Sequence, residues 1–526
     1  MKKSPAENLG RTSNATQSIP VTRRKFLLAG GAAATAFVVA PRHVLGGPGF
    51  VAPSEKVTLA YIGCGTQGLR EMLGLLSMNE IQIVAVCDPV KDGRDYVDWS
   101  KDGLRNDIAK ALNKPDWRRD KPWIPGGRDV ARDIIETAYG NQKRTGKFNG
   151  CATYVDFREL LEKEKDLHAV KVMTPDHLHA TVSVAAMNKG KHVMMHKPLA
   201  NRLHEARLVL QTARQSGVAT HFLPASDGAE VRKVKGWIDA GAIGTLREIH
   251  NWSNRPVWPQ YAQVPTDQPP IPQEFDWQLW LGPSLDRPYH PHFTNAVFRG
   301  WYEFGGGALA DMGHYSLWPV FQLFELDSPF AVESRPTHIC SMNDHVPHKV
   351  QNDYSFPASC TVRFQFTARA SRPAIDLFWY DGSIKPPAPD ELGDADLDAE
   401  GLMFVGDKGK ILCGFRGEDP RILSGNKSAE SQADAASAKP QRAGPRRTEA
   451  VALWVAACKG GPHTYGDFLL AGPISDAFTL GAVSLRMGGK RLRFDSAKAR
   501  ITNVEQANQY LTREYRKGWE LPIPSA

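Results

Sequence analysis

The chain has 526 residues, of which 42% are hydrophobic and 23% are charged. This composition excludes collagen-like, coiled-coil and wholly disordered proteins, and the length predicts two to four domains of about 100–200 residues each. The formal net charge is +8, but residues 1–50 hold seven Lys or Arg and one acid, Glu7, and so carry +6 of it. Because the rest of the chain is nearly neutral, no nucleic-acid partner is expected.

Basic residues followed by a short apolar run occupy the N-terminus. The pair Arg23-Arg24 precedes an apolar run of 15 residues from Phe26 to Ala40, which is shorter than the roughly 20 residues of a membrane span. The paired arginines before Phe-Leu resemble a twin-arginine signal. We therefore expect residues 1–50 to be a signal and linker, read by the twin-arginine export machinery. The mature protein is then periplasmic or secreted and has no stable membrane anchor.

The cysteines form no recognisable motif. There are seven of them, with no CxxC pair, at positions 64, 87, 151, 340, 360, 413 and 458. An odd, scattered set predicts neither a disulfide framework nor a zinc site. We expect buried free thiols.

A glycine-rich turn behind the signal predicts a dinucleotide site. The apolar run Val57–Ile62 leads into this turn, and a helical pattern and a second β-rich run, Ile81–Cys87, follow before Asp88. The turn consists of Gly63, Cys64, Gly65, Thr66, Gln67 and Gly68. Its three glycines allow, in order, the tight turn, the close approach of backbone to pyrophosphate, and close helix–strand packing. A carboxylate at position 88 accepts from a ribose 2′-hydroxyl and repels a 2′-phosphate, so NAD is favoured over NADP.

Strands and helices then alternate after a polar insertion at 91–150, in which one helix is expected at Val130–Tyr139. The expected helices are Phe157–Glu164, Ala180–Lys189 and Leu203–Ser216, and the expected strands are Ala169–Met173, Val193–His196 and Ala219–Leu223. The alternation predicts a doubly wound parallel sheet. Polar clusters stand at its carboxyl strand ends, where such sheets bind ligands: Asp88, Thr174–His179 and His196-Lys197-Pro198.

From Gly244 the pattern changes to period-two alternation, clearest in Thr361–Phe366, which predicts a mostly antiparallel sheet. Other expected strands are Thr245–Trp252, Ala374–Tyr380, Gly401–Val405 and Lys410–Cys413, and the expected helices are Ala450–Lys459, Ala471–Met487 and Ala507–Trp519. Aromatic faces and planar donors suit sugar rings. The candidate substrate residues are therefore Trp252, Arg255, Arg299 and Trp301, with plain core packing as the alternative for each tryptophan.

The sequence resembles the Gfo/Idh/MocA family, which includes glucose–fructose oxidoreductase and inositol dehydrogenase. The resemblance extends from about Val57 to Leu521 and rests on the glycine turn with Asp88, Thr174–Ala180, Gly190–Leu199 and Gly305–His314. It implies a Rossmann domain, here 51–224, and a C-terminal α/β domain with a large open sheet, here 225–526, whose final helices return toward the first domain. It also implies NAD(P)-linked oxidation or reduction at a sugar or cyclitol carbon, and a homodimer or homotetramer.

The resemblance also implies catalytic residues, with two departures. The family's Glu-Lys-Pro triplet is His196-Lys197-Pro198 here, and Lys197 is expected to bind the reacting oxygen with a pKa lowered by burial. The family's second motif places His four residues after Asp, whereas His314 is three residues after Asp311 and Tyr315 takes the fourth place. We expect His314 as the general acid/base, Tyr315 as its substitute, and Asp311 to orient His314 or Lys197 or to bind a sugar hydroxyl.

The remaining polar residues at the strand ends are assigned to the cofactor. These are Thr174, Pro175, Asp176, His179 and His196, of which Asp176 and His196 are expected near the nicotinamide ribose or the lysine. The group His177, His179 and His196 also suggests a metal. Because no carboxylate or thiolate stands at ligand spacing from them, no metal is predicted.

Three functions remain open at this point. The leading hypothesis is an exported NAD-dependent oxidoreductase of a sugar, sugar derivative or polyol, with a tightly held cofactor because free NAD is scarce outside the cytoplasm. The second is an NAD-dependent glycoside hydrolase that oxidises, eliminates and re-reduces, as some exported members of the fold do. The third is a protein that binds NAD or sugar without turnover.

Overall fold

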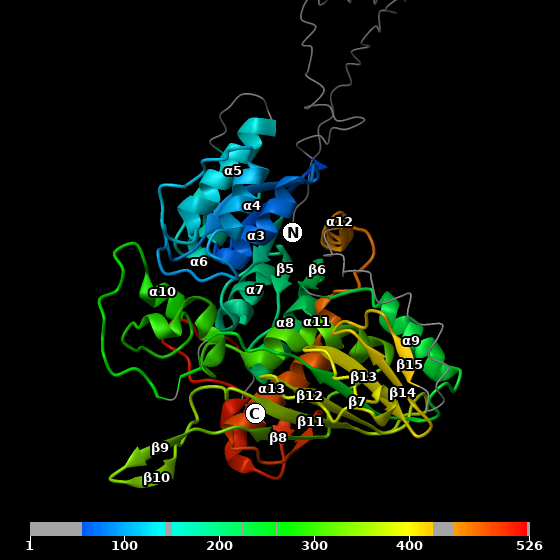
Figure 1. The fold of residues 1–526 in the computed structure, drawn as a ribbon. Helices are drawn as coiled ribbons and strands as arrows, with labels where there is room; N and C mark the ends of the chain where they lie inside the picture. The colour runs from blue at the N-terminus through cyan, green and yellow to red at the C-terminus, as the bar shows by residue number, and fades with distance from the viewer. Residues whose placement is uncertain are drawn as a thin grey trace, which may run out of the picture. The chain divides into compact units, whose positions relative to one another are not determined.

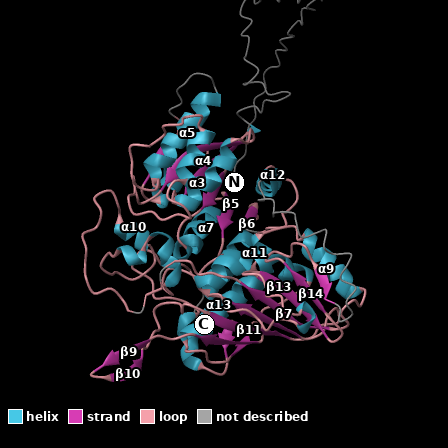
Figure 2. Ribbon diagram, viewed as in Figure 1, coloured by secondary structure: helices cyan, strands magenta, loops and turns pink. Residues whose placement is uncertain are grey.

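The computed structural model describes residues 55–142, 150–223, 225–258, 260–261, 263–423 and 445–522. Residues Lys56–Ala526 form one compact unit, whose elements are labelled in Figure 1 and coloured by type in Figure 2. The expected signal at 1–50 lies outside the described residues. None of the described helices combines the length and the apolar character that a membrane crossing requires.

The first sheet has six parallel strands in the order β3-β2-β1-β4-β5-β6. The strands are β1 Val57–Ile62, β2 Ile81–Cys87, β3 Ala152–Tyr154, β4 Ala169–Val172, β5 His192–His196 and β6 Thr220–Leu223. The strand β1 lies in the middle of the sheet; from it the chain runs outward through β2 to β3 and then resumes at β4 on the other side of β1. The predicted doubly wound sheet is confirmed, and its ligand-binding switch point lies between β1 and β4.

The described helices between the strands of this sheet are α3 Thr66–Leu76, α4 Gly103–Ala111, α5 Arg128–Gln142, α6 Phe157–Lys163, α7 His179–Asn188 and α8 Leu203–Ser216. The insertion at 91–150 therefore holds two described helices, α4 and α5, and not the single one expected. The helix α4 was missed because only two large apolar residues, Leu104 and Ile108, mark its buried face. Both pack into the same core as Leu69 of α3.

The second sheet has nine strands in the order β15-β14-β13-β7-β12-β11-β8-β16-β17. They are β7 Leu246–Trp252, β8 Ala331–Pro336, β11 Cys360–Phe366, β12 Ile375–Tyr380, β13 Gly401–Gly406, β14 Lys410–Cys413, β15 Arg421–Leu423, β16 Leu492–Asp495 and β17 Arg500–Ile501. Every neighbouring pair is antiparallel except β7 with β12. The predicted mostly antiparallel sheet is confirmed. A separate hairpin, β9 Cys340–Asn343 with β10 Val346–Lys349, is exposed along its whole length.

Two helices, α11 Gly307–Leu323 and α13 Gly472–Arg486, pack against each other. Contacts from α13 reach both α8 of the first domain and β8 of the second sheet. The side chains of Phe222, Leu309 and Phe478 lie in one hydrophobic core that spans both sheets. The two halves of the chain are therefore joined by a continuous apolar interior, which fixes α11 relative to the parallel sheet.

Other helices are α9 Ala229–Asp239, α10 Trp277–Leu281 and α12 Pro445–Cys458. The helix α12 returns to the first domain, where Trp454 is fully buried and its indole N–H donates to the carbonyl oxygen of Ala219 at 3.3 Å. Its neighbour Val451 joins the core of that domain.

The helix expected over Ala507–Trp519 is wrong. A short 3₁₀ helix, η9, covers Glu505–Tyr510, and the described chain beyond it is not helical. The carbonyl oxygen of Leu511 accepts from the backbone N–H of His204, and that of Thr512 accepts from Arg202 Nε. Because the start of α8 occupies these carbonyl groups, they are not available to continue a helix.

All seven cysteines are free. Five are buried as expected, Cys458 is half-buried, and Cys340 in the projecting hairpin is exposed.

Candidate active site

The glycine turn is built by the close approach of two backbone segments. Gly63 has φ +98°, and a side-chain carbon there would lie 2.4 Å from the carbonyl carbon of Met173 at the end of β4. A side-chain carbon on Gly68 would lie 2.5 Å from the carbonyl oxygen of Gly63. Only glycine fits either position. The turn therefore lies directly against the switch point of the sheet.

The turn opens onto a cleft with a volume of about 480 Å³, a size typical of cofactor sites. Gly65 begins α3 without a side-chain cap, so the N–H groups of the first helical turn remain available to phosphate oxygens. Residues from both domains line the cleft: Gly63, Gly65, Thr66, Gln67, Gly68, Asp88, Thr174 and Pro175 from the first, and Phe298, Arg299 and Trp519 from the second. The side chain of Thr66 donates to Val97 O and that of Gln67 to Glu71.

Asp88 lies at the end of β2 with both carboxylate oxygens held by backbone amides. Its Oδ2 accepts from the N–H of Cys64 at 2.6 Å, and its Oδ1 accepts from the N–H of Val90 at 2.8 Å. Burial raises the pKa of Asp88 to about 6, against the opposing effect of these two amides and of Arg128. The group is therefore mainly ionised at neutral pH, and its remaining lone pairs can accept from ribose hydroxyls.

One wall of the cleft could not be predicted from the sequence. The Tyr96 ring, in the insertion, lies so close to Gly65 that a side-chain carbon there would be 3.3 Å from the ring. Side-chain carbons on Gly93 and Gly126 would be 2.4 and 2.3 Å from the same ring. The ring of Tyr96 therefore packs against these three glycines beside the start of α3. The cradle of glycines, the uncapped helix and the buried carboxylate together fit a dinucleotide.

A buried ion pair joins the two domains next to Arg299, which lines the cleft. Lys197, directly after β5, donates to Oδ1 of Asp311 on α11, and Arg299 Nε lies 3.2 Å from the same oxygen. The side chains are 2%, 12% and 18% exposed for Lys197, Asp311 and Arg299. Burial and Arg299 lower the pKa of Lys197, which Asp311 partly restores. Burial alone would raise the pKa of Asp311, but the two cations bring it down to about 2.

The residues three and four places after Asp311 lie on different sides of α11. Tyr315 is half-buried, its hydroxyl lies 3.1 Å from His196 Nε2, and Lys197 Nζ is 5.5 Å from its ring centroid. His314 is fully buried between Phe222 and Phe478, with Nδ1 2.7 Å from the carbonyl oxygen of Ala310. Burial lowers the pKa of His314 to about 3. The structure thus brings Tyr315, and not His314, to the lysine.

The segment after β4 supports the same site. Asp176 is buried and its Oδ2 accepts from the N–H of Gly306, ahead of α11. Burial raises the pKa of Asp176, although Arg299 and Lys197 act against it. His179 bridges Pro198 O at 2.6 Å and Thr174 O at 2.9 Å. Among the residues that the structure describes, no group of three or more His, Cys, Asp or Glu is arranged to hold a metal ion.

Three of the four candidate substrate residues do not line the cleft. Trp252 and Trp301 are buried, and their indole N–H groups donate to the carbonyl oxygens of Asp398 and His292. Arg255 stacks over Trp99, with 4.8 Å between its guanidinium carbon and the ring centroid. Of the four, only Arg299 lines the cleft and contacts the ion pair. Trp99, which is 64% exposed, was not singled out in the sequence.

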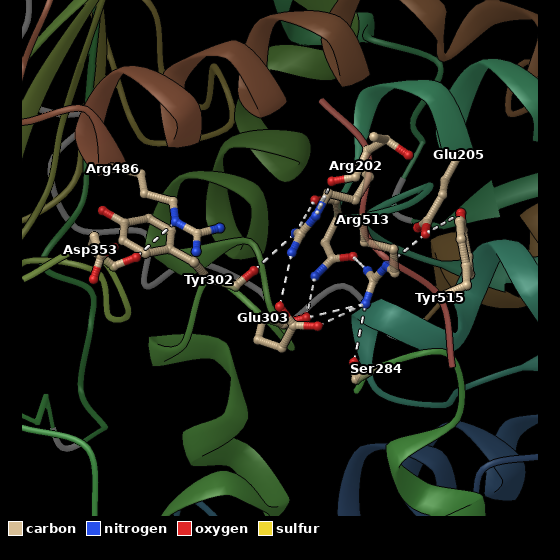
Figure 3. Close-up of polar contacts among 11 residues, drawn as sticks. Arg202, Glu205, Ser284, Tyr302, Glu303, Asp353, Arg486, Arg513 and Tyr515 are labelled. Atoms are coloured by element: carbon tan, nitrogen blue, oxygen red, sulfur yellow. Dashed lines mark hydrogen bonds and ion pairs between the residues drawn. The ribbon is translucent and has the colours of Figure 1, made fainter. Parts of the chain in front are cut away.

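A network of buried charges holds the chain just before α11 (Figure 3). Arg513 Nε donates to Glu205 on α8 at 2.7 Å, and its Nη1 lies 3.5 Å from Glu303. Arg202 Nη2 lies 3.3 Å from the second oxygen of Glu303, and its Nη1 donates to Tyr302 O at 2.9 Å. The network ties the C-terminal segment to α8 and to Tyr302 and Glu303, which shortly precede α11, so it helps to position Asp311.

Two family models match the chain in the order of its domains. Residues 126–222 match "Oxidoreductase family, NAD-binding Rossmann fold", and residues 228–363 match "Oxidoreductase family, C-terminal alpha/beta domain". The glycine turn and Asp88 precede the first matched range. Together with the cleft, these matches define an NAD-binding oxidoreductase fold. Both matched models are Gfo/Idh/MocA oxidoreductase models, so residues 126–222 and 228–363 are similar to the two domains of that family.

Individual relatives are distant. The chain is 28% identical to levoglucosan dehydrogenase of Pseudarthrobacter phenanthrenivorans over 145 residues, 26% of this chain and 36% of that protein. It is 25% identical to glycosyl hydrolase family 109 protein 1 of Shewanella sp. strain MR-4 over 211 residues, 37% of this chain and 38% of that protein. The chain thus spans little more than a third of the length of these relatives.

Solved structures are similar at low identity. The WlbA dehydrogenase from Bordetella pertussis, in complex with NADH and UDP-GlcNAcA, has a TM-score of 0.46 and 14% identity. The similarity covers 84% of this chain and 99% of that one.

The first prediction concerns Asp88. Asp88→Asn replaces the carboxylate that accepts hydrogen bonds from the ribose hydroxyls by a neutral amide. The affinity for NAD is therefore expected to fall roughly 10- to 100-fold, and the protein should discriminate less against NADP. In the wild type, affinity is expected to drop as the pH falls below about 6, where Asp88 gains a proton. Calorimetric titration of cofactor-free protein from pH 5 to 8 measures both effects. The same pH dependence in the variant would contradict the role of Asp88.

The second prediction concerns Glu303. Arg202 and Arg513 overcome the effect of burial and lower its pKa to about 2. A lowered carboxyl pKa stabilises the fold above the unfolded value of about 4.3, and that stabilisation is lost as the pH falls toward 2. Glu303→Gln is expected to lower the free energy of unfolding by about 2–3 kcal/mol at pH 7, with a smaller difference at pH 3. Urea unfolding measures this, with Glu159→Gln at an exposed ion pair as control. An equal loss at both pH values would contradict it.

Proposed function

We propose that the protein is an NAD-dependent oxidoreductase that acts on a carbinol or carbonyl carbon of a sugar, sugar derivative or polyol. The observation that carries the proposal is the position of Lys197. Its ammonium group is buried at a strand end beside the dinucleotide cleft and is held by Asp311, which also pairs with Arg299. A cation fixed at this place can bind an oxygen whose negative charge grows as a C–H bond is broken.

Each residue of the site has its own role in the proposed reaction. NAD, when bound, would supply the redox chemistry by accepting or donating a hydride. Lys197 hydrogen-bonds the reacting oxygen, and Asp311 keeps the ammonium group in place. Tyr315 is the acid/base in reach of that oxygen, because His314 is enclosed by Phe222 and Phe478. Arg299 lines the cleft and meets the substrate near the reacting carbon.

The substrate class rests on the family and on the polar lining of the inner cleft. The named relatives include a levoglucosan dehydrogenase, a 1,5-anhydro-D-fructose reductase and an inositol 2-dehydrogenase. Hydroxyl-rich substrates also suit a site whose reactive groups are ammonium, guanidinium, carboxylate and phenol.

We further propose export and a retained cofactor. The Arg23-Arg24 pair followed by a short apolar run supports twin-arginine export to the periplasm or medium. Outside the cytoplasm the cofactor must be carried along and recycled between substrates. The Tyr96 wall beside Gly65 would slow its escape. A homodimer or homotetramer through the nine-stranded sheet is the assembly that the family resemblance suggests.

A second candidate is an NAD-dependent glycoside hydrolase. It is favoured by the match to a glycosyl hydrolase family 109 protein over 211 residues. The two candidates differ in net redox change. A released ketone or a reduced acceptor identifies the oxidoreductase, whereas a freed sugar without net redox change identifies the hydrolase.

The third prediction tests Lys197. Lys197→Met keeps the length of the side chain but removes the ammonium group, so turnover is expected to fall about 10²- to 10⁴-fold while NAD remains bound. Steady-state kinetics and mass spectrometry of the bound cofactor measure the two effects. Undiminished turnover would reject the role of Lys197.

The fourth prediction concerns the cofactor itself. Protein purified from the exported fraction is expected to release NAD, and not NADP, on denaturation, as mass spectrometry of the supernatant would show. A screen of sugars and glycosides with and without an electron acceptor then separates the two candidates. Protein that carries no nucleotide and gains none on incubation with NAD would contradict the proposal.

A further inference from the structure

Behind Tyr315 lies a chain of polar side chains that the proposed reaction does not yet use. His196 Nε2 lies 3.1 Å from the Tyr315 hydroxyl and 3.4 Å from Oε1 of Glu71 on α3. The other oxygen of Glu71 accepts from Lys171 Nζ of β4 at 2.7 Å. The side chains of Lys171, Glu71 and His196 are only 2–6% exposed. The chain therefore leads from a half-buried phenol at the site into the interior of the first domain.

A contribution to folding stability does not explain why these polar side chains are buried here. Removing a lysine and a glutamate from water costs several kcal/mol for each ion, and apolar residues of similar size often serve a core equally well. Lys171 and Glu71 are an ion pair below the sheet surface, and Gln67 adds a hydrogen bond to Glu71 at 3.1 Å. Such a pair fixes the position of Glu71. Its carboxylate is thereby held within reach of one imidazole nitrogen.

His196 is uncharged before the reaction, and Glu71 opposes the effects that weaken it as a base. Burial lowers its pKa well below the usual value, the cations Lys197, Arg299 and Lys171 act in the same direction, and Glu71 opposes them. The ring is therefore neutral at rest. In the tautomer that carries its proton on Nδ1, the bare Nε2 would accept the Tyr315 O–H. Once Nε2 is protonated, the new N–H can turn toward Glu71.

We propose that Tyr315, His196 and Glu71 form a proton relay for the oxidation at the Lys197 site, an inference that rests on the proposed function. Bound NAD⁺ would accept the hydride from the substrate carbon. The substrate O–H bond breaks, and its proton passes to the Tyr315 oxygen. The Tyr315 O–H bond breaks in turn, and its proton forms an N–H bond at His196 Nε2. The carboxylate of Glu71 balances the positive charge of the imidazolium. His196 and Glu71 are positioning residues, since they act through Tyr315.

Kinetics test the relay against a structural role. Tyr315→Phe is expected to lower kcat about 10²-fold or more, and His196→Ala to be partly rescued by added imidazole. Glu71→Gln removes the charge that raises the pKa of His196, so kcat falls and the acidic limb of the pH profile moves to lower pH. Glu159→Gln, the matched surface control, leaves both unchanged. A Glu71→Gln profile identical to that of the wild type, or no rescue by imidazole, overturns the relay.

A measurement without substrate separates the relay from the proposed function. Nitrogen NMR of ¹⁵N-histidine-labelled protein, with His196→Gln to assign the signal, is expected to show an unprotonated Nε2. Its resonance should shift in Tyr315→Phe. A protonated Nε2 at neutral pH, or no shift in Tyr315→Phe, overturns the relay even if sugars are turned over. The expected NMR result without any redox turnover would instead reject the proposed function.

Discussion

The structure depends on one interaction, the ion pair between Lys197 and Asp311. It joins the end of β5 in the parallel sheet to α11 of the second domain. Removing an ammonium group from water costs several kcal/mol unless a carboxylate compensates for it. Asp311 does so, and Arg299 lies against the same oxygen. Neither domain alone holds all three groups, so the site exists only where the two halves of the chain meet.

The surrounding structure holds the two domains in a fixed position relative to each other. A continuous apolar core runs from Phe222 to Phe478. The charged network around Glu303, shown in Figure 3, anchors the chain immediately before the glycines of α11. On the other side of the cleft, the close approach of Gly63 to Met173 places the uncapped start of α3 against the switch point. The dinucleotide cleft and the lysine are thus two consequences of the same strand order.

Much of this could be predicted from the sequence, because the signals are local. The glycine turn with Asp88 and the alternation of apolar runs predict the parallel sheet, and α8 begins and ends at the expected residues, Leu203 and Ser216. The prediction of a terminal helix was wrong. Arg202 and His204, at the start of α8, donate to the carbonyl oxygens that such a helix would use. No local pattern records such long-range competition.

For the site residues too, local sequence patterns predict part of the structure, and long-range packing decides the rest. Positions three and four after Asp311 are both neighbours on a helix, but they lie about 60° and 40° to opposite sides of it. Only the packing of Phe222 and Phe478 decides that His314 turns into the core and Tyr315 toward Lys197. Similarly, Trp252 and Trp301 satisfy their indole N–H groups inside the second domain, and the position of Tyr96 depends on glycines distant in sequence.

The central claim is that a nicotinamide ring binds beside the buried lysine. A crystal structure of the protein with NAD⁺ and a bound polyol tests it most directly. The account predicts pyrophosphate at the start of α3, and a substrate hydroxyl within hydrogen-bonding distance of Lys197 Nζ with its carbon facing the nicotinamide. Nucleotide bound elsewhere, or a nicotinamide ring remote from Lys197, would contradict it.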